Sequence, residues 1–194
     1  MKKIKLKSQN GFRIEGPWLI KPDLFNDNRG FFYESWNEEF FNSIVGTNIK
    51  FLQDNHSSSK KGVLRGLHYQ LPPNSQGKLV RCIKGAIYDV AVDLRKNSPT
   101  FLNWTYAELS SKNKKQFWIP SGFAHGFLAL SDRTEVLYKA TGYWSKKDER
   151  SIHWNDPTLS INWPINSLES SKIIISEKDN LALKVNEIID ADFF

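Results

Sequence analysis

Two short segments of the chain each place one histidine among strand-forming and aromatic residues. His68 lies in residues 63–70 (Val-Leu-Arg-Gly-Leu-His-Tyr-Gln), and His125 lies in residues 117–127 (Phe-Trp-Ile-Pro-Ser-Gly-Phe-Ala-His-Gly-Phe). Only four histidines occur in the whole chain. Because the ordinary imidazole pKa is about 6.5, a histidine can take up or release a proton near neutral pH. The two segments therefore indicate proton-transfer chemistry in a sheltered pocket.

The spacing Pro120-x-Gly122-x-x-His125 resembles a signature of cupin barrels. A metal-binding cupin would carry His-x-His in the first segment, whereas here the residue two places after His68 is Gln70. Two isolated histidines without further ligands are not the usual transition-metal set. We therefore expect no bound metal, and a metal ion that polarises the substrate is the alternative.

Composition and length predict one globular domain spanning residues 1–194. Hydrophobic residues make up 40% and charged residues 25% of the chain, which is typical of a folded protein. The single cysteine, Cys82, cannot form an internal disulfide, which favours a reducing compartment. The basic start of the chain is followed by no apolar core, and no apolar run approaches the roughly 18 residues of a membrane span. We expect a cytoplasmic protein without a membrane segment.

The chain carries a surplus of positive charge, with 27 Lys and Arg against 21 Asp and Glu, a difference of 6. The lysines are dispersed in pairs rather than gathered in one tract, and no nucleic-acid-binding motif accompanies them. A diphosphate needs only two or three well-placed cations. The charge therefore favours a small anionic ligand over nucleic acid.

Most of the chain reads as short strands separated by Gly, Pro, Asn and Ser, a pattern typical of a sandwich or barrel. Short helices are predicted from Asn37, where two acids follow a capping residue, and from Ser176 through Val185. The fold class predicted is therefore all-β, a cupin or jelly-roll barrel with a few short helices. The candidate strands are residues 31–36, 51–55, 63–70, 78–84, 86–94, 104–109, 116–119, 123–130 and 135–141.

Alternation along residues 63–70 gives conflicting directions for two candidate residues. His68 shares a face with Leu64 and Gly66, whereas Arg65 points the other way. If Arg65 also serves a site, either Gly66 permits a β-bulge or the arginine serves a neighbouring subunit. By the same rule Asp89 and Asp93 share one face of residues 86–94, which we expect to be a solvated sheet face.

Nine motifs, in their order along the chain, closely resemble those of the dTDP-4-dehydrorhamnose 3,5-epimerase family, the cupin enzymes that make the precursor of L-rhamnose. Any one of them is a weak signal, but the ordered set is highly specific and runs from about Pro22 to Asp179. The motifs are Asp27-Asn-Arg-Gly-Phe-Phe-Tyr-Glu34, Gln53-Asp-Asn55, Leu64-Arg-Gly-Leu-His68, Gln76-Gly-Lys-Leu-Val-Arg81, Tyr88-Asp-Val-Ala-Val-Asp93, Trp118-Ile-Pro-Ser-Gly-Phe-Ala-His-Gly-Phe127, Leu137-Tyr-Lys-Ala-Thr141, Ile152-His-Trp-Asn-Asp156 and Ser176-Glu-Lys-Asp179.

This resemblance implies that the substrate is dTDP-4-keto-6-deoxy-D-glucose, inverted at C3 and C5 to dTDP-4-keto-L-rhamnose for polysaccharide biosynthesis. His68 matches the family's catalytic base and Tyr138 its proton donor. Asp179 matches the carboxylate that orients the base, and Lys78 the cation near the keto oxygen. No cofactor is implied.

The resemblance also implies a substrate-binding set, to which the partner subunit of a homodimer contributes a part. That contribution would explain the direction of Arg65. His125 is similar to a further substrate contact, and Tyr143 to a platform that stacks on the base. The nucleotide-binding residues implied are Arg29, Glu34, Gln53, Asn55, Arg65, Tyr143, Glu149 and Lys178.

The chemistry of epimerisation beside a ketone independently calls for these residue types. A base removes the acidic α-proton, an enolate forms, and an acid returns a proton to the opposite face. A carboxylate beside the histidine fixes its tautomer and stabilises the imidazolium. An ammonium group stabilises the enolate oxygen, an electrostatic effect commonly worth about 3 kcal/mol. Since no Gly-x-Gly-x-x-Gly motif follows a strand, a dinucleotide cofactor is not expected.

Several alternatives remain open from the residues alone. Asp179 could close a helix N-terminus, because Ser176-Glu-Lys-Asp179 is also a capping-box pattern. Tyr143 could be an exposed aromatic without a ligand, and His56 and His153 are interpreted as structural or solvent-facing. At the level of function the alternatives are a mono-epimerase or ketoisomerase on a related nucleotide-linked sugar, and a non-catalytic sugar-nucleotide binding module.

Overall fold

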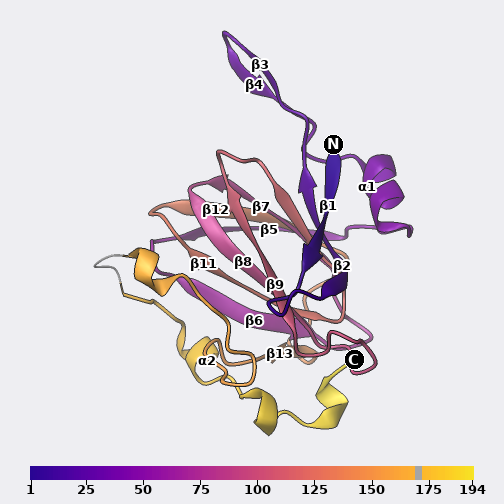
Figure 1. Cartoon of the computed structure of the whole chain (residues 1–194), viewed down its shortest axis with the longest axis vertical. Coiled ribbons are helices and arrows are strands. Elements are labelled where there is room, and N and C mark those ends of the chain that lie inside the picture. Colours follow the sequence, from indigo (N-terminus) through magenta and orange to yellow (C-terminus); the bar gives the residue numbers. More distant parts are fainter. Residues whose placement is uncertain (169–171) are drawn as a thin grey trace.

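The computed structural model describes residues 1–168 and 172–194, and its core is a barrel of two antiparallel sheets that face each other (Figure 1). The first sheet has the order β1-β2-β10-β7-β12-β5, and the second has the order β13-β6-β11-β8-β9. The strands are β1 (Lys2–Lys7), β2 (Arg13–Lys21), β5 (Gln53–Ser59), β6 (Leu64–Gln70), β7 (Lys78–Lys84), β8 (Ala86–Asp93), β9 (Trp104–Ser110), β10 (Gln116–Ile119), β11 (Phe123–Ala129), β12 (Thr134–Ala140) and β13 (Glu149–Ser151).

The all-β barrel predicted from the sequence is confirmed, and most strand predictions agree with the structure to within a few residues. The prediction for residues 31–36 is wrong beyond Phe32, where regular pairing ends. Strands β1, β2 and β13, and a short strand at Phe25–Asp27, were not predicted. In β1 and β13 no residue is fully buried, so neither strand carries the alternation of buried and exposed positions that marks a strand in the sequence.

Three apolar clusters fill the layers of the molecule. The barrel interior is packed by residues such as Val80, Ala91, Phe117 and Phe127 from both sheets. The outer face of the second sheet is covered by the chain after β13, including Val185. The outer face of the first sheet is covered by α1 (Glu38–Val45). Both faces of the central strands are therefore buried.

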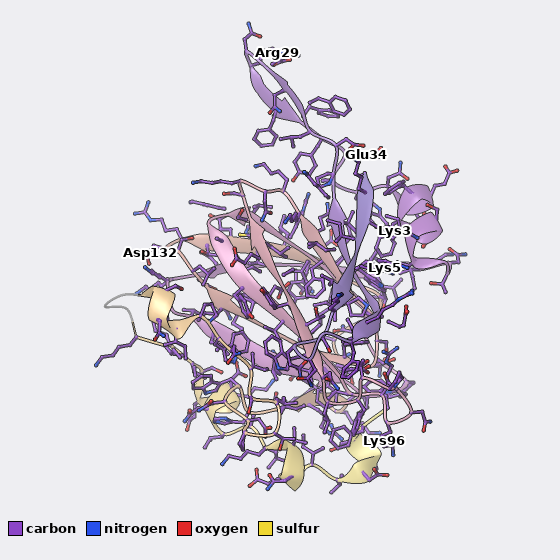
Figure 2. All side chains as sticks on the ribbon, in the orientation of Figure 1. Lys3, Lys5, Arg29, Glu34, Lys96 and Asp132 are labelled. Atoms are coloured by element: carbon purple, nitrogen blue, oxygen red, sulfur yellow. The ribbon has the colours of Figure 1, made fainter. Side chains whose placement is uncertain are left out.

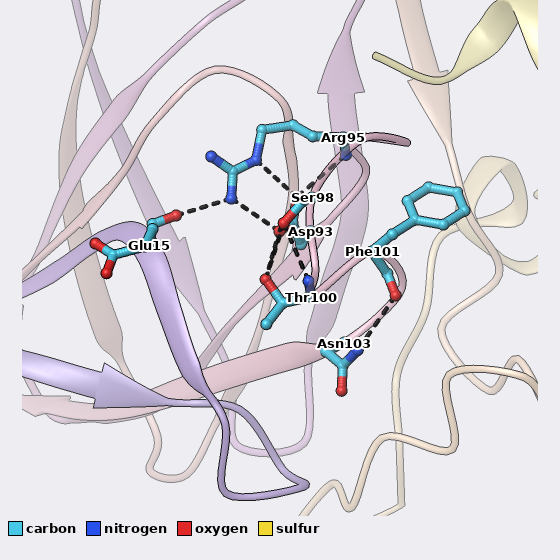
Figure 3. A network of polar contacts seen from close by, with 7 residues as sticks. All are labelled: Glu15, Asp93, Arg95, Ser98, Thr100, Phe101 and Asn103. Carbon is cyan, nitrogen blue, oxygen red and sulfur yellow. Dashed lines mark hydrogen bonds and ion pairs between the residues drawn. The ribbon is translucent and has the colours of Figure 1, made fainter.

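The expectation that Asp89 and Asp93 occupy a solvated sheet face is wrong. Both side chains are fully buried, because the opposite face of β8 is covered as well and this face is the barrel interior. Asp93 is satisfied at the end of the strand by Arg95, Ser98 and Thr100, whose donors lie 2.6–3.1 Å from its carboxylate oxygens (Figure 3). Although burial acts to raise the pKa of Asp93, these hydrogen bonds hold it below its ordinary value.

The helices are short and capped as the sequence indicates. Asn37 caps α1 by accepting a hydrogen bond from the backbone N–H of Phe40. The second helix, α2 (Glu177–Asn180), is shorter than predicted, because the chain turns back to pair Leu183 with Ile152. Three 3₁₀ turns, at Ile165–Leu168, Val185–Glu187 and Asp190–Asp192, complete the helical segments. Among the residues that the structure describes, no helix has the length and apolarity needed to cross a bilayer.

A two-stranded hairpin extends away from the barrel near the N-terminal end of the first sheet (Figure 1). It consists of β3 (Phe25–Asp27) and β4 (Gly30–Phe32), and these strands pair only with each other. Its aromatic side chains are exposed, with Phe25 at 64% and Phe32 at 72% of their full surface. Within the described part of the chain, the hairpin thus pairs with no other strand, and these two phenylalanines remain largely exposed.

Candidate active site

One cavity of about 540 Å³ in the barrel contains most of the residues expected to do chemistry. The second sheet supplies one wall, the first sheet supplies the facing wall, and the segment around α2 closes one side. The side chains around the cavity come from Ser57, Val63, Leu64, Arg65, His68, Lys78, His125, Phe127, Tyr138, Ile174, Ile175, Ser176, Lys178 and Asp179.

His68 and Asp179 form a close pair at the wall of this cavity. The Nε2 atom of His68 lies 2.6 Å from Oδ1 of Asp179, although the two residues are 111 positions apart in sequence. The other carboxylate oxygen accepts a 3.2 Å hydrogen bond from the backbone N–H of Gly66. Burial acts to raise the pKa of Asp179, but the hydrogen bonds from His68 and Gly66 outweigh it and lower the pKa. The arrangement holds an ionised carboxylate against the imidazole and leaves Nδ1 as the second ring nitrogen.

Asp179 also belongs to the first turn of α2, as the capping-box pattern indicates. Its backbone N–H donates to the hydroxyl of Ser176, which is the N-cap residue of that helix. The carboxylate itself accepts from His68 and Gly66. Backbone and side chain of the same residue therefore do separate tasks, since one closes the helix and the other faces the imidazole.

A β-bulge brings Arg65 and His68 to the same cavity. His68 lies opposite His125 on β11 and Arg65 lies opposite Phe127, so the register shifts by one residue between these two pairs. Gly66 occupies the bulge with a φ of +111°, and a Cβ at this position would lie 2.6 Å from the Cα of Gly126. Only glycine fits this close approach. The conflict in alternation is resolved by the bulge within one chain.

A second histidine–carboxylate pair lies beside the first on the neighbouring strands. Nε2 of His125 lies 2.6 Å from Oδ1 of Asp89 on β8, and both side chains are buried. Burial lowers the pKa of His125 and raises that of Asp89, more strongly than their mutual attraction opposes it. Asp89 was not expected at the site, although its alternation with Ile87 and Ala91, which line the barrel interior, is a signal that could have placed it there.

Lys78 and Tyr138 face this wall from the first sheet, on strands β7 and β12. Burial lowers the pKa of Lys78 to about 8, although the negative charges of Asp89 and Glu149 act to raise it. Burial raises the pKa of Tyr138, with Arg65 acting in the opposite direction. Near neutral pH the site therefore offers a phenol that keeps its proton and a lysine that is mostly in its ammonium form.

Glu149 and Lys178 form an ion pair beside the cavity, with Nζ of Lys178 2.5 Å from Oε2 of Glu149. Burial acts to raise the pKa of Glu149, but the hydrogen bond from Lys178 lowers it below its ordinary value. The side chain of Lys178 is 55% exposed, so the pair can exchange partners with an incoming anion.

Six residues expected to bind the nucleotide do not line the cavity of their own chain. One is Glu149, which pairs with Lys178 beside the cavity, and the other five lie farther along the sheets or in the hairpin. Arg29 lies at the tip of the hairpin, where it pairs with Asp27, and Glu34 lies near its base (Figure 2). Gln53 and Asn55 hydrogen-bond to each other on β5, and Asn55 lies opposite Tyr138. The fifth, Tyr143, lies in the segment after β12 and is 64% exposed.

His56 and His153 also lie outside this cavity. His56 is exposed on the outer face of the first sheet, where its Nε2 lies 3.4 Å from Glu135. Nδ1 of His153 accepts a hydrogen bond from the backbone N–H of Asn155. In residues 1–168 and 172–194, no three His, Cys, Asp or Glu side chains are grouped to hold a metal ion.

Asp179→Asn tests whether this carboxylate does more than support the helix. The amide keeps the size and one hydrogen-bond acceptor but removes the charge that stabilises an imidazolium, so we expect turnover to fall by about 100-fold or more. Steady-state kinetics on the purified variant would measure the loss. Ser176→Ala is the matched comparison, since loss of the cap should lower the free energy of unfolding by about 1 kcal/mol. Near-normal turnover of Asp179→Asn would contradict a role beyond capping.

The fold and the cavity together define a cupin-type barrel whose pocket carries acid–base groups. The family described as dTDP-4-dehydrorhamnose 3,5-epimerase matches residues 11–187. The dTDP-4-dehydrorhamnose 3,5-epimerase of Shigella flexneri is 51% identical over 176 residues, which cover 91% of this chain and 93% of that protein. The chain therefore belongs to the dTDP-4-dehydrorhamnose 3,5-epimerase family.

Two solved structures extend the comparison. dTDP-6-deoxy-D-glucose-3,5-epimerase from Legionella pneumophila, in complex with dTDP-4-keto-L-rhamnose, is 43% identical with a TM-score of 0.89, and the match covers 99% of this chain and 97% of that one. ChmJ, a 3'-monoepimerase from Streptomyces bikiniensis in complex with dTDP-quinovose, is 32% identical with a TM-score of 0.81, covering 88% and 84%. The same barrel thus serves both double and single epimerases.

Proposed function

We propose that this chain inverts C3 and C5 of dTDP-4-keto-6-deoxy-D-glucose, giving dTDP-4-keto-L-rhamnose. His68 removes the proton beside the ketone, Asp179 stabilises the resulting imidazolium, and Lys78 stabilises the enolate oxygen. Tyr138 returns a proton from the opposite face. The observation that carries this proposal is the single cavity in which His68 and Asp179 on one wall face Tyr138 and Lys78 on the other.

The arrangement suits inversion because base and acid come from different sheets. A proton removed on one face of a flat enolate and returned on the other changes the configuration of the carbon. His68 lies on β6 and Tyr138 on β12, so a sugar ring held between the sheets meets one group on each face. The ketone oxygen, which gains negative charge in the enolate, then needs a donor such as Lys78.

Two cations near the cavity are suited to the diphosphate. Arg65 is anchored by hydrogen bonds to Ser59 and to the backbone carbonyl of Ser58, and its guanidinium has further donors for a phosphate. Lys178 lines the same cavity from α2, the helix that also carries Asp179. Tyr143 is proposed to stack on the thymine, since its exposed ring has the flat apolar surface that such contacts use.

The distant positions of Arg29 and Glu34 favour a homodimer in which the hairpin reaches the site of the partner subunit. The exposed phenylalanines of the hairpin would pack on an apolar surface of the partner. Because a dimer of this kind has a twofold axis, the partner's hairpin would reach the site of the first chain in the same way. A cytoplasmic location is proposed with it, because Cys82 is a buried free thiol and the chain has no second cysteine.

Mixed dimers test the sharing of sites between subunits. Arg29→Ala and His68→Asn chains, each nearly inactive alone, are co-expressed with different tags. If Arg29 serves the partner, a random mixture should regain about a quarter of the wild-type sites, because half of the dimers are mixed and each contains one intact site. In the tag-purified mixed dimer one of the two sites should be intact, so its activity should reach about half that of the wild type. No gain above the average of the two parents would contradict a shared site.

Proton exchange in heavy water tests the proposed reaction directly. Proton NMR would follow the uptake of deuterium into dTDP-4-keto-6-deoxyglucose. We expect deuterium to enter at both C3 and C5. Exchange at C3 alone would favour the mono-epimerase reaction named for the Streptomyces bikiniensis relative. No exchange at either carbon would overturn the proposal and favour a binding module.

A further inference from the structure

Gln70 ends strand β6 at the position where a metal-binding cupin would carry its second histidine, and the residue is only 4% exposed. Its amide makes three hydrogen bonds to backbone groups. Nε2 donates to the carbonyl oxygens of Asn74, at 2.5 Å, and Tyr143, at 3.1 Å. Oε1 accepts from the backbone N–H of Ser145 at 2.8 Å. The buried amide is therefore fully engaged, and two of its three bonds hold the segment 142–145 that follows β12.

Two further glutamine side chains hold the same segment. Gln76 donates from Nε2 to the carbonyl oxygen of Gly142 at 2.6 Å, and Gln53 on β5 accepts from the backbone N–H of Trp144 at 3.1 Å. With the two bonds from Gln70, one backbone group of each of the four residues is bound by a glutamine amide. An amide suits this task because it both donates and accepts, whereas a carboxylate only accepts and a hydrocarbon does neither.

The segment carries two adjacent aromatic residues that are exposed. Tyr143 is 64% and Trp144 is 56% exposed, although the backbone beneath both is fixed by the glutamines. An exposed segment without such bonds would sample many conformations. Because the conformational entropy of this backbone is lost during folding, a flat ligand that binds the rings does not have to order it.

The segment also lies next to the candidate active site and is tied to both sheets. Gln70 is two residues from His68 on β6, in the second sheet, and Gln53 lies on β5, in the first sheet. Glu149 lies opposite Gln70 on β13, and its ion-pair partner Lys178 lines the cavity. A ligand that reaches from the cavity toward Lys178 would therefore have the two rings within its neighbourhood.

We propose that Gln70 is a positioning residue for nucleotide recognition, which orders the segment 142–145 before the ligand arrives so that its rings can receive the thymine. Gln70 acts through these rings, because its own amide is buried and fully engaged. This inference rests on the proposed function and deepens it, since it concerns binding of the base rather than chemistry at the sugar. The position of a metal ligand in other cupins thus holds a hydrogen-bonding anchor in this chain.

Gln70→Leu tests the proposal by removing the amide at a similar side-chain size. Calorimetry compares two probes, dTDP and inorganic pyrophosphate, of which only dTDP has a base. We expect dTDP to bind about tenfold more weakly to the variant than to the wild type, and pyrophosphate to bind equally well to both. KM should rise by a similar factor, while kcat stays within about threefold of the wild-type value. A general loosening of the site would weaken both probes alike, and that result, or unchanged binding of dTDP, would overturn the proposal.

Gln9→Leu is the matched control. The side chain of Gln9 also bonds to a backbone group, the N–H of Trp104 at 2.7 Å, but the residue does not line the cavity or contact the segment through this bond. Its replacement should leave the affinity for both probes unchanged.

Double variants show whether Gln70 acts through a ring. Gln70→Leu is combined with Tyr143→Ala and, separately, with Trp144→Ala. For at least one ring, the alanine substitution should cost much less dTDP affinity in the Gln70→Leu protein than in the wild type. Fully additive losses with both rings would contradict the proposal.

If Gln70→Leu does not fold, ¹⁵N relaxation of the ligand-free wild-type protein decides. The proposal requires the amides of Tyr143, Trp144 and Ser145 to be as ordered as those of β12, with order parameters of about 0.85. Mobile amides in this segment would overturn it. Wild-type protein that binds no dTDP would overturn the proposed function and this inference together, whereas binding of dTDP without proton exchange in the sugar would contradict only the proposed reaction.

Discussion

Replacing His68 with asparagine is expected to lower turnover by about 1,000-fold or more, because the enzyme loses its catalytic base. Among the described residues that line the cavity, His68 is the histidine that combines a carboxylate partner with an accessible ring. His68 is 29% exposed at its side chain, whereas His125 is 8% exposed and tied to a carboxylate of raised pKa. Asparagine is polar and smaller than histidine, and it cannot accept a proton near neutral pH. The loss should appear in the rate of deuterium uptake at both C3 and C5.

His153→Asn is the matched control for this substitution, since it removes an imidazole outside the cavity and should leave exchange near the wild-type rate. Circular dichroism and a thermal melt would show that both variants fold. Rapid deuterium uptake by His68→Asn would contradict the assignment of the base and would turn attention to His125.

Tyr138→Phe is expected to separate proton removal from inversion. The phenol keeps its proton near neutral pH, because burial raises its pKa, so the wild-type residue is in the acid form. Phenylalanine preserves the ring but cannot return the proton, and the enolate is then reprotonated from the side of His68 with the original configuration. The variant should exchange substrate protons with deuterium while product formation falls by about 100-fold or more.

NMR of the sugar, which reports deuterium content and ring configuration in one experiment, measures both quantities. Tyr106→Phe, on an exposed position of β9, provides a comparison that removes a phenol elsewhere. If Tyr138→Phe inverted the sugar at the normal rate, another group would have to be the acid.

The sequence predicts the barrel and the placement of several candidate residues in one cavity, because motif order and strand alternation are local signals. His68, Lys78 and Tyr138 fall on strands whose inward faces the pattern already indicates, and the glycine beside Arg65 already allows the bulge. These residues meet in one cavity as expected. The identity of the carboxylate that contacts His68 also agrees, since Asp179 lies 2.6 Å away.

The errors have a common physical origin in long-range burial. Alternation places Asp89 on one face of β8 but does not say that the other face is covered by the chain after β13, so the polar face was assigned to solvent. In the same way, Arg29 carries a motif that predicts diphosphate binding, yet its distance from the cavity follows from a hairpin that pairs only with itself. Such features depend on what packs against a segment, and a local pattern does not encode it.

The position of Asp179 after the last strand has a consequence for the order in which the protein is synthesised on the ribosome. Every strand of both sheets ends by Ser151, whereas the carboxylate that faces His68 is synthesised later. A nascent chain can thus contain all its strands while His68 still lacks Asp179, the carboxylate that stabilises its protonated ring. A chain released before Ser176 would contain every strand of both sheets but would lack the carboxylate that faces His68 and, with Val185, part of the apolar cover of the second sheet.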